Sequence, residues 1–321
     1  ILNSAYSANT TFGKPNASET IGGIDTQQYK INVDLNDIPL FNFNKTVNGK
    51  STTFQLVSGG ISGTSLVEET PVPGNTMGIF YRNDLRGNSS ANTGFFLHFK
   101  QGVLQSAPFT INDPSTNEII NLNVPNINDS DVWLWQLDQF GNFSQLWEKL
   151  PSVYGSNVIY NSINKNQRNI FAVTTRDNDQ VSLNFADGSF GNLPNGSFVS
   201  YFRASNGLTY TIDPNDMRNI VVGIPYISKR GQKNTLRLQL ALQSTVTNAS
   251  ASETDDNIRR NAPQAYYTQN RMITAEDYNT FPLTSSPQIA KSKAVNRASS
   301  GISRQFEIQD PTGKYSTTNL I

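Results

Sequence analysis

Short strands broken by turn residues are the pattern that most constrains this chain, and residues 181–210 show it best. Val, Leu and Phe alternate with polar residues over 181–185, which predicts a strand with one buried face. Further strands are predicted at 198–203 and 208–212, so the segment is expected to form a β-meander. The residues between these strands tolerate positive φ or favour turns: Asp187, Gly188, Gly191, Pro194, Asn195, Gly196, Asn206 and Gly207.

The same pattern recurs along the chain. Asn48-Gly49 is a pair that favours the type I′ turn of a β-hairpin. Residues 1–28 show no clear period, which indicates a loop or an arm that wraps a neighbouring molecule. Apolar alternation or clustering predicts strands at 28–35, 54–58, 77–82, 95–99, 132–137, 158–163, 169–175, 220–227, 236–242, 289–297 and 304–309.

Residues 143–150 fit two interpretations. Phe143, Leu146 and Trp147 have the spacing of one face of a helix. The segment is short, however, and Pro151 follows it, so we favour the returning strand of a hairpin.

Two short helices are predicted near the C-terminal end. Ser252 is expected to open the first helix and Pro263 to end it. Thr274 is expected to cap the second helix, which Pro282 would end. Glu276 and Asp277 then lie beside the positive end of that helix, where acidic side chains are stabilising.

Composition agrees with a multidomain, mainly β (α+β) protein with antiparallel sheets, meanders and a few short helices near the C-terminal end. The 321 residues include 22 Gly and 15 Pro, and long runs of strong helix formers are few. We predict a β-rich region at 1–175, with a break near 70–94 that could separate two lobes. A β-meander region at 176–245 and an α+β region at 246–321 follow.

Charge and cysteine content exclude several classes of function. The 25 basic and 25 acidic residues give no net charge, so we expect no nucleic-acid partner. The absence of cysteine excludes disulfides, thiol catalysis and cysteine-ligated zinc. No apolar run is long enough for a transmembrane helix, so no membrane association is expected. The chain begins at Ile1 rather than at methionine, which suggests a fragment of a longer protein.

Candidate catalytic and binding motifs are better explained as structure. Gly49-Lys50-Ser51 lacks the upstream glycine and the following helix of a phosphate-binding loop, so a hairpin is favoured. His98 is the only histidine and lies in an apolar strand, which indicates a partly buried residue. Asp129–Asp131 and Asp177–Asp179 lack the remainder of a calcium loop and are interpreted as loop caps. We therefore expect no enzyme activity, no cofactor and no metal.

Two blocks resemble a known family. The first contains Phe185-Ala-Asp-Gly-Ser-Phe-Gly191, a Pro-Asn-Gly turn, Tyr201-Phe-Arg203 and Ser-Asn-Gly. The second runs from Arg260 to Tyr278. Their order and spacing resemble the baseplate J-like family, and within it the C-terminal half of the baseplate wedge proteins of T-even-like contractile-tailed phages. The likeness covers the chain from about residue 181 onward.

This resemblance implies a structural protein of the virion, located in the tail baseplate after assembly in the host cytoplasm. Such proteins associate with themselves, here as a homodimer and in the assembled baseplate as a ring. They also contact other wedge proteins and reorient when the sheath contracts. The candidate structural and interface residues are Arg260, Tyr266, Tyr267, Asn270, Arg271, Thr274, Glu276, Asp277 and Tyr278.

An alternative from another class is a carbohydrate-binding or glycan-degrading tail spike or adhesin. Trp133, Trp135, Trp147, Tyr154 and Tyr160 cluster in the middle of the chain, and such side chains can stack on sugars. A β-core is the favoured explanation for most of them. A tail spike usually shows sequence repeats and an acidic cleft, and this chain has neither visible repeats nor an excess of acidic residues.

Overall fold

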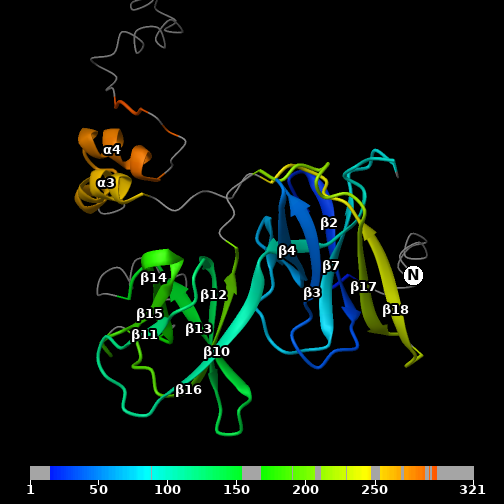
Figure 1. Cartoon of the computed structure of the whole chain (residues 1–321), viewed down its shortest axis with the longest axis horizontal. Helices are drawn as coiled ribbons and strands as arrows, with labels where there is room; N and C mark the ends of the chain where they lie inside the picture. Colours follow the sequence, from blue (N-terminus) through cyan, green and yellow to red (C-terminus); the bar gives the residue numbers. More distant parts are fainter. Residues whose placement is uncertain are drawn as a thin grey trace, which may run out of the picture. The chain divides into compact units, whose positions relative to one another are not determined.

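The computed structural model describes residues 15–87, 89–153, 168–189, 191–206, 211–228, 230–246, 254–268, 271–285, 289 and 291–294 (Figure 1). Strands dominate, and the two described helices lie near the C-terminal end, so the predicted mainly β fold class is confirmed. The chain divides into two compact units, Ile1–Ala251 and Ser252–Ile321.

The first unit contains two β-lobes, one inserted into the other (Figure 1). The outer lobe comprises residues 15–102 and 211–246, and the inserted lobe comprises residues 103–206. The strands of the outer lobe are β1 (Ala17–Ile21), β2 (Ile24–Asn32), β3 (Phe41–Val47), β4 (Lys50–Val57), β5 (Gly59–Ser62), β6 (Ser65–Glu68), β7 (Thr76–Asn83), β8 (Gly94–Phe96), β9 (His98–Gln101), β17 (Ile220–Ile227) and β18 (Lys233–Leu240).

One hydrophobic core joins three of the four small sheets of the outer lobe, and the β5-β6 sheet contributes no residue to it. The sheets have the orders β1-β2-β7-β8, β3-β4-β9, β5-β6 and β17-β18. Alternate residues of β2, β3, β4, β7 and β17 point into a shared cluster, in which Phe54 stacks on Phe43 with ring centroids 5.4 Å apart. Val33 forms a bridge to Tyr226, so the lobe needs chain from both sides of the insertion.

The inserted lobe is built on one seven-stranded sheet. Its strands are β10 (Val103–Ile111), β11 (Ile119–Leu122), β12 (Ile127–Leu137), β13 (Phe143–Leu150), β14 (Ile170–Thr175), β15 (Val181–Phe185) and β16 (Gly196–Ala204), and the 3-10 turn η1 (Asp177–Asp179) joins β14 to β15. The order is β10-β16-β12-β13-β14-β15-β11. All pairings are antiparallel except that of β13 with β14.

The sheet curls so that strands far apart in its order meet across the core. Trp147 lies with its ring centroid 5.5 Å from those of both Phe185 and Phe198, although β15 and β16 are separated by three other strands. The expected direct pairing of 181–185 with 198–203 is therefore wrong. The long turn-rich connection between them carries the chain across the curled sheet instead of forming a tight hairpin, and 207–210 lie outside the described residues.

Several predicted strands are confirmed. Asn48 and Gly49 both have positive φ, 49° and 77°, and join β3 to β4. Residues 132–137 lie in β12, which is paired on both sides, by β16 and β13. The hairpin interpretation of 143–150 is confirmed, because β13 pairs antiparallel with β12. Strands are also present within 28–35, 54–58, 77–82, 169–175, 220–227 and 236–242.

Other predictions need correction. Residues 95–99 form two strands, and β8 pairs with β7 whereas β9 pairs with β4. A continuous apolar run shows that both faces are covered but not that one sheet covers them. Residues 17–28, expected to be loop, form a hairpin of β1 and β2 that turns at Gly22-Gly23. β1 is an edge strand, and most of its side chains are exposed, so the apolar alternation that marks a half-buried strand is missing. The predictions for 158–163 and 304–309 lie outside the described residues. In the predicted strand 289–297, residues 289 and 291–294 are described and are not strand.

The second unit contains the helices α3 (Asp255–Thr268) and α4 (Ala275–Ser285). Both continue past the proline that was expected to end them, Pro263 in α3 and Pro282 in α4. A proline removes one donor of the helix, and the residues on either side can keep their own hydrogen bonds. Ser252 lies outside the described residues. None of the described helices is long and apolar enough to cross a membrane.

We predict that Gly78→Ala lowers the free energy of unfolding by about 1–3 kcal/mol. A Cβ at this position of β7 would overlap the carbonyl oxygen of Gly59 in β5, so a backbone must move. Urea denaturation measures the change. Gly74→Ala is the control, because the nearest atom to its Cβ would lie 3.9 Å away, and a change within about 0.5 kcal/mol is expected there. Equal effects of the two substitutions would contradict the close packing of β5 on β7.

Candidate functional site

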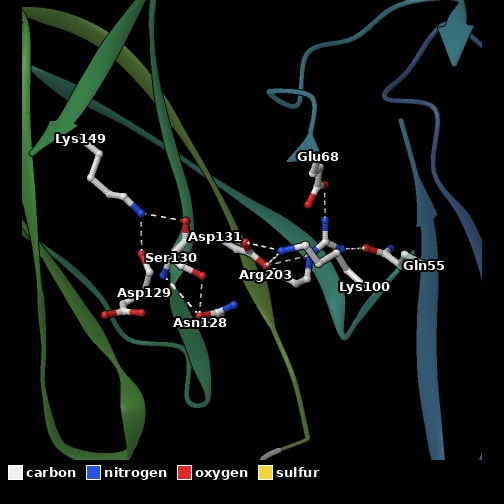
Figure 2. Close-up of polar contacts among 9 residues, drawn as sticks. All are labelled: Gln55, Glu68, Lys100, Asn128, Asp129, Ser130, Asp131, Lys149 and Arg203. Carbon is white, nitrogen blue, oxygen red and sulfur yellow. Dashed lines mark hydrogen bonds and ion pairs between the residues drawn. The ribbon is translucent and has the colours of Figure 1, made fainter. Parts of the chain in front are cut away.

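A buried arginine lies where the outer and inserted lobes meet. Arg203 of β16 is 1% exposed, and its guanidinium reaches three residues from different elements (Figure 2). Nη2 lies 2.5 Å from Oε1 of Glu68, and Nη1 donates to Oε1 of Gln55 at 2.5 Å. Nε lies 3.5 Å from Oδ2 of Asp131. Glu68 and Gln55 belong to the outer lobe, so Arg203 binds the two lobes to each other.

Asp131 makes a second link between the lobes. Lys100 of β9 donates to both of its carboxylate oxygens, at 3.0 and 3.3 Å (Figure 2). Asp131 is buried at 4% exposed, whereas the Lys100 side chain is 30% exposed. We call Arg203, Glu68, Asp131 and Lys100 the interlobe charge cluster. Its two cations and two anions balance when all four side chains are charged.

A bulge in β12 places Asp131 beside Arg203. Ile127 pairs with Ala204 and Val132 with Phe202, so the four residues between them on β12 face Arg203 alone. Lys149 of β13 holds this bulge by donating to the carbonyl oxygens of Asp129 and Ser130, at 2.9 and 2.7 Å. Asn128 Oδ1 accepts from the Ser130 hydroxyl at 2.9 Å (Figure 2). Lys149 therefore positions Asp131 without touching it.

Burial changes the protonation of the cluster. Loss of water raises the pKa of Glu68 to about 7, because this cost outweighs the attraction of Arg203, and Asp131 adds to the rise. Oε2 of Glu68 has no hydrogen-bond partner in the described structure. Burial and Lys100 lower the pKa of His98 on β9, and Arg203 lowers it further, whereas Asp131 acts against the shift.

The charges of the cluster are matched within the protein and across the two lobes. Each cation of the cluster contacts a carboxylate, so its charge is already matched within the protein. His98 is half-buried on β9, as predicted. No group of three or more His, Asp or Glu side chains able to hold a metal ion occurs within the described ranges. Asp129–Asp131, interpreted from the sequence as a loop cap, instead supplies the buried Asp131.

The helical unit carries the predicted interface residues on an exposed surface. Tyr266 and Tyr267 of α3 are 76% and 79% exposed, and their rings contact each other edge to face at 6.1 Å. Tyr278 of α4 is exposed as well. Arg260, Arg271 and Glu276 are exposed, Asp277 is half-buried, and Asn270 lies outside the described residues.

Exposed apolar side chains concentrate on the described part of this unit. Seven of the large apolar side chains described as exposed belong to residues 254–294: Ile258, Tyr266, Tyr267, Met272, Ile273, Tyr278 and Ile289. Among the side chains described there, none is buried. Two short helices are marginally stable in water without a packed apolar face. The surface of α3 and α4 is therefore a candidate interface.

Comparison with known families gives a match over most of the chain. The model of the family described as "Domain of unknown function (DUF8360)" matches residues 1–245, about three quarters of the chain. The chain belongs to the DUF8360 family. A search of curated proteins finds no match. The DUF8360 region contains both β-lobes and the interlobe charge cluster, and α3 and α4 lie beyond it.

Sequence reasoning missed the cluster within the DUF8360 region. Arg203 belongs to the Tyr-Phe-Arg segment that carried the family resemblance, yet it was not singled out as a site residue. In β16, Phe198, Ser200 and Phe202 face the core, so Arg203 lies on the opposite face. The alternation of buried and exposed residues along a strand predicts that this face is exposed to solvent. In the structure the outer lobe packs on it, so Arg203 is buried. A charged residue at the end of a strongly apolar strand is the signal that could have indicated it.

We predict that Thr274→Ala lowers the stability of α4 by about 1 kcal/mol. Thr274 Oγ1 accepts from the Asp277 backbone N–H at 3.2 Å, and Asp277 Oδ2 accepts from the Thr274 N–H at 2.7 Å, which confirms the expected cap. Loss of helical circular dichroism on heating measures the effect. Thr274→Ser keeps the hydroxyl and should behave as wild type; if Ser and Ala variants lose equal stability, the cap is not responsible.

Proposed function

We propose that this chain is a structural component of a contractile phage tail baseplate wedge. It would self-associate through the helical unit, as a homodimer and within a ring, and contact other wedge proteins in the virion. The observation that carries the proposal is the exposed apolar surface of α3 and α4, which has no core of its own among the described residues. The described exposed residues of the family-like block from Arg260 to Tyr278 contribute to that surface, which supports assembly as its role.

The physical role proposed is mechanical. β-Lobes with separate cores behave as rigid bodies, and interfaces between such bodies can change when a large assembly contracts. No cofactor, metal, nucleic acid, membrane or bond-making step is required. Clustered tyrosine and arginine side chains are enriched among the residues that contribute most to protein interfaces.

Light scattering tests self-association. The wild-type chain is expected to form a dimer at high concentration, and the Tyr266→Ser/Tyr267→Ser variant is expected to remain monomeric. Phe140→Ser is the matched control, because Phe140 is as exposed as Tyr267, 79%, but lies on the β12–β13 turn of the inserted lobe. A monomeric wild type, or equal loss in the Tyr266/Tyr267 and Phe140 variants, contradicts the proposed interface. Electron microscopy with purified tail components then tests incorporation into a baseplate.

A carbohydrate-binding tail-spike or adhesin function is the second proposal. Trp135, Phe143 and Tyr201 line one face of β12, β13 and β16, with Phe143 contacting the other two rings at 5.5 and 6.2 Å. Partly exposed aromatic faces of this kind can stack on sugars. Glycan-array binding that is lost in Trp135→Ala would favour this function over the wedge proposal. The Trp135 indole also donates to the Pro71 carbonyl oxygen at 3.0 Å, which supports a packing role instead.

A further inference from the structure

The two lobes of the first unit have separate hydrophobic cores. The outer-lobe cluster and the inserted-lobe clusters share no residue among those described. Polar contacts join the lobes: besides the charge cluster, Gln55 Oε1 accepts from the Leu104 N–H at 2.8 Å, and Gln101 Nε2 donates to Asn206 Oδ1 at 3.1 Å. Polar interfaces between domains permit relative motion more readily than large apolar ones.

The chain passes between the lobes at two adjacent points. It leaves the outer lobe at Gly102 and returns after Ala204, and Val103 pairs with Ala204. Gly102 has a φ of +96°, and a Cβ there would lie 2.5 Å from the Ala204 carbonyl oxygen. Where the described residues reach the lobe boundary, Gly102 and Val103 lie beside Ala204 as one narrow, two-stranded connection. Such a connection can act as a hinge, because few backbone dihedrals need to change.

The interlobe charge cluster lies at this connection. Lys100 precedes Gly102 by two residues, and Arg203 immediately precedes Ala204. We propose that Arg203, Glu68, Asp131 and Lys100 form a latch that fixes the orientation of the inserted lobe on the outer lobe, and that release of the latch allows the lobes to rotate about the Gly102–Ala204 connection. This inference rests on the proposed wedge function and deepens it, since it identifies the moving part.

The chemistry of the cluster suits a latch. Charged partners are satisfied in one geometry only, because hydrogen bonds to the guanidinium and the carboxylates are directional. Apolar side chains of similar volume often stabilise a buried site as well or better, so a cluster of charges is better explained by orientation than by stability. Water that enters on opening can hydrate the unpaired Oε2 of Glu68, which offsets part of the cost of separation.

The absence of cysteine makes the test direct. Spin labels at Thr46→Cys in the outer lobe and Thr116→Cys in the inserted lobe are placed on exposed residues and report the distance between lobes by electron-electron double resonance. The labelled chain should give one narrow distance distribution. Arg203→Met should add a second population at a different distance. Each loss of about 1.4 kcal/mol in docking free energy raises the ratio of open to closed chains about tenfold.

Lys100→Met is a second test of the latch, to be used if the Arg203→Met variant does not fold. Its side chain is partly exposed, so folding should tolerate the change, and the second population should again appear. Lys30→Met is the matched control: the Lys30 side chain is 31% exposed and pairs with Glu69 at 2.6 Å within the outer lobe. It should leave the distribution unchanged. A single, unshifted distribution in every folded latch variant overturns the latch.

The latch and the wedge proposal can fail separately. The distance measurement uses the isolated chain, so its result does not depend on assembly into a tail. If latch variants open but the wild type fails to dimerise or to join tail components, the latch proposal is supported and the wedge function is overturned. If the wild type assembles but the latch variants stay closed, the wedge function is supported and the latch proposal is overturned.

Discussion

Arg203→Met is expected to lower the free energy of unfolding by about 3–5 kcal/mol at pH 8. The substitution keeps most of the side-chain volume but removes the ion-pair partner of Glu68. Asp131 then keeps only one of its two cationic neighbours, Lys100. A carboxylate left buried without a partner is costly, because neither water nor a cation stabilises its charge. Urea denaturation followed by the fluorescence of buried Trp147 measures the loss.

Two further variants separate charge from packing. Arg203→Met/Glu68→Met replaces the pair by apolar side chains and should recover most of the lost stability. Lys30→Met breaks a partly exposed pair and should cost no more than about 1 kcal/mol. If Arg203→Met costs as little as Lys30→Met at pH 8, Arg203 does not hold the lobes together in the manner described.

The second large effect is on pH dependence. We compare the free energy of unfolding of the wild type with that of Glu68→Gln. The wild-type value minus the variant value is expected to fall by about 3 kcal/mol as the pH rises from 4.5 to above 7. The ordinary pKa of the glutamate is 4.5, and burial raises it to about 7 in the folded chain. One pKa unit corresponds to about 1.4 kcal/mol, which sets the size of the change.

The sign follows from proton binding. Between pH 4.5 and 7 the folded chain retains the Glu68 proton that the unfolded chain has lost, so rising pH favours unfolding. The contribution is therefore complete below 4.5 and lost above 7. Urea denaturation at several pH values measures it. A difference that stays constant over this range, or that grows with pH, would contradict a buried Glu68 with a raised pKa.

Subtraction of Glu68→Gln is needed because His98 acts in the opposite direction. Its pKa is lowered in the folded chain, so the stability it contributes is lost as the pH falls through its ordinary value of 6.5. The charged groups that face Glu68 are Arg203, Lys100 and Asp131, and all three remain in the variant. The difference between the two chains thus reports on the Glu68 carboxyl.

Local pattern predicted individual elements well. Asn48-Gly49 could be identified as a hairpin turn because few other pairs adopt positive φ at both positions. The alternation of Leu236, Leu238 and Leu240 with polar residues predicted a strand despite good helix formers, and β18 confirms it. The Thr274 cap was equally predictable, since its hydrogen bonds join residues close in sequence.

Long-range pairing could not be predicted in the same way. A period of two says which face of a strand is buried but not which strand lies beside it, so the separation of β15 from β16 was not foreseen. Arg203 shows the same limit for the site. Its partners Gln55 and Glu68 are more than 130 residues away in the sequence, and no local pattern links them to it. Pro263 and Pro282 were misinterpreted because a proline weakens a helix without always ending it.

The insertion of one lobe into the other imposes an order on folding during synthesis. The ribosome releases the whole inserted lobe, up to Ala204, before Ile220, Val222 and Ile224 of β17 emerge. These three residues belong to the outer-lobe core, so that core stays incomplete while the inserted lobe can already collapse. Nascent chains stalled so that Ala204 has left the ribosomal exit tunnel while β17 is still inside it should therefore carry a protease-resistant inserted lobe and a still-sensitive N-terminal segment. The outer lobe would then close around a finished inserted lobe.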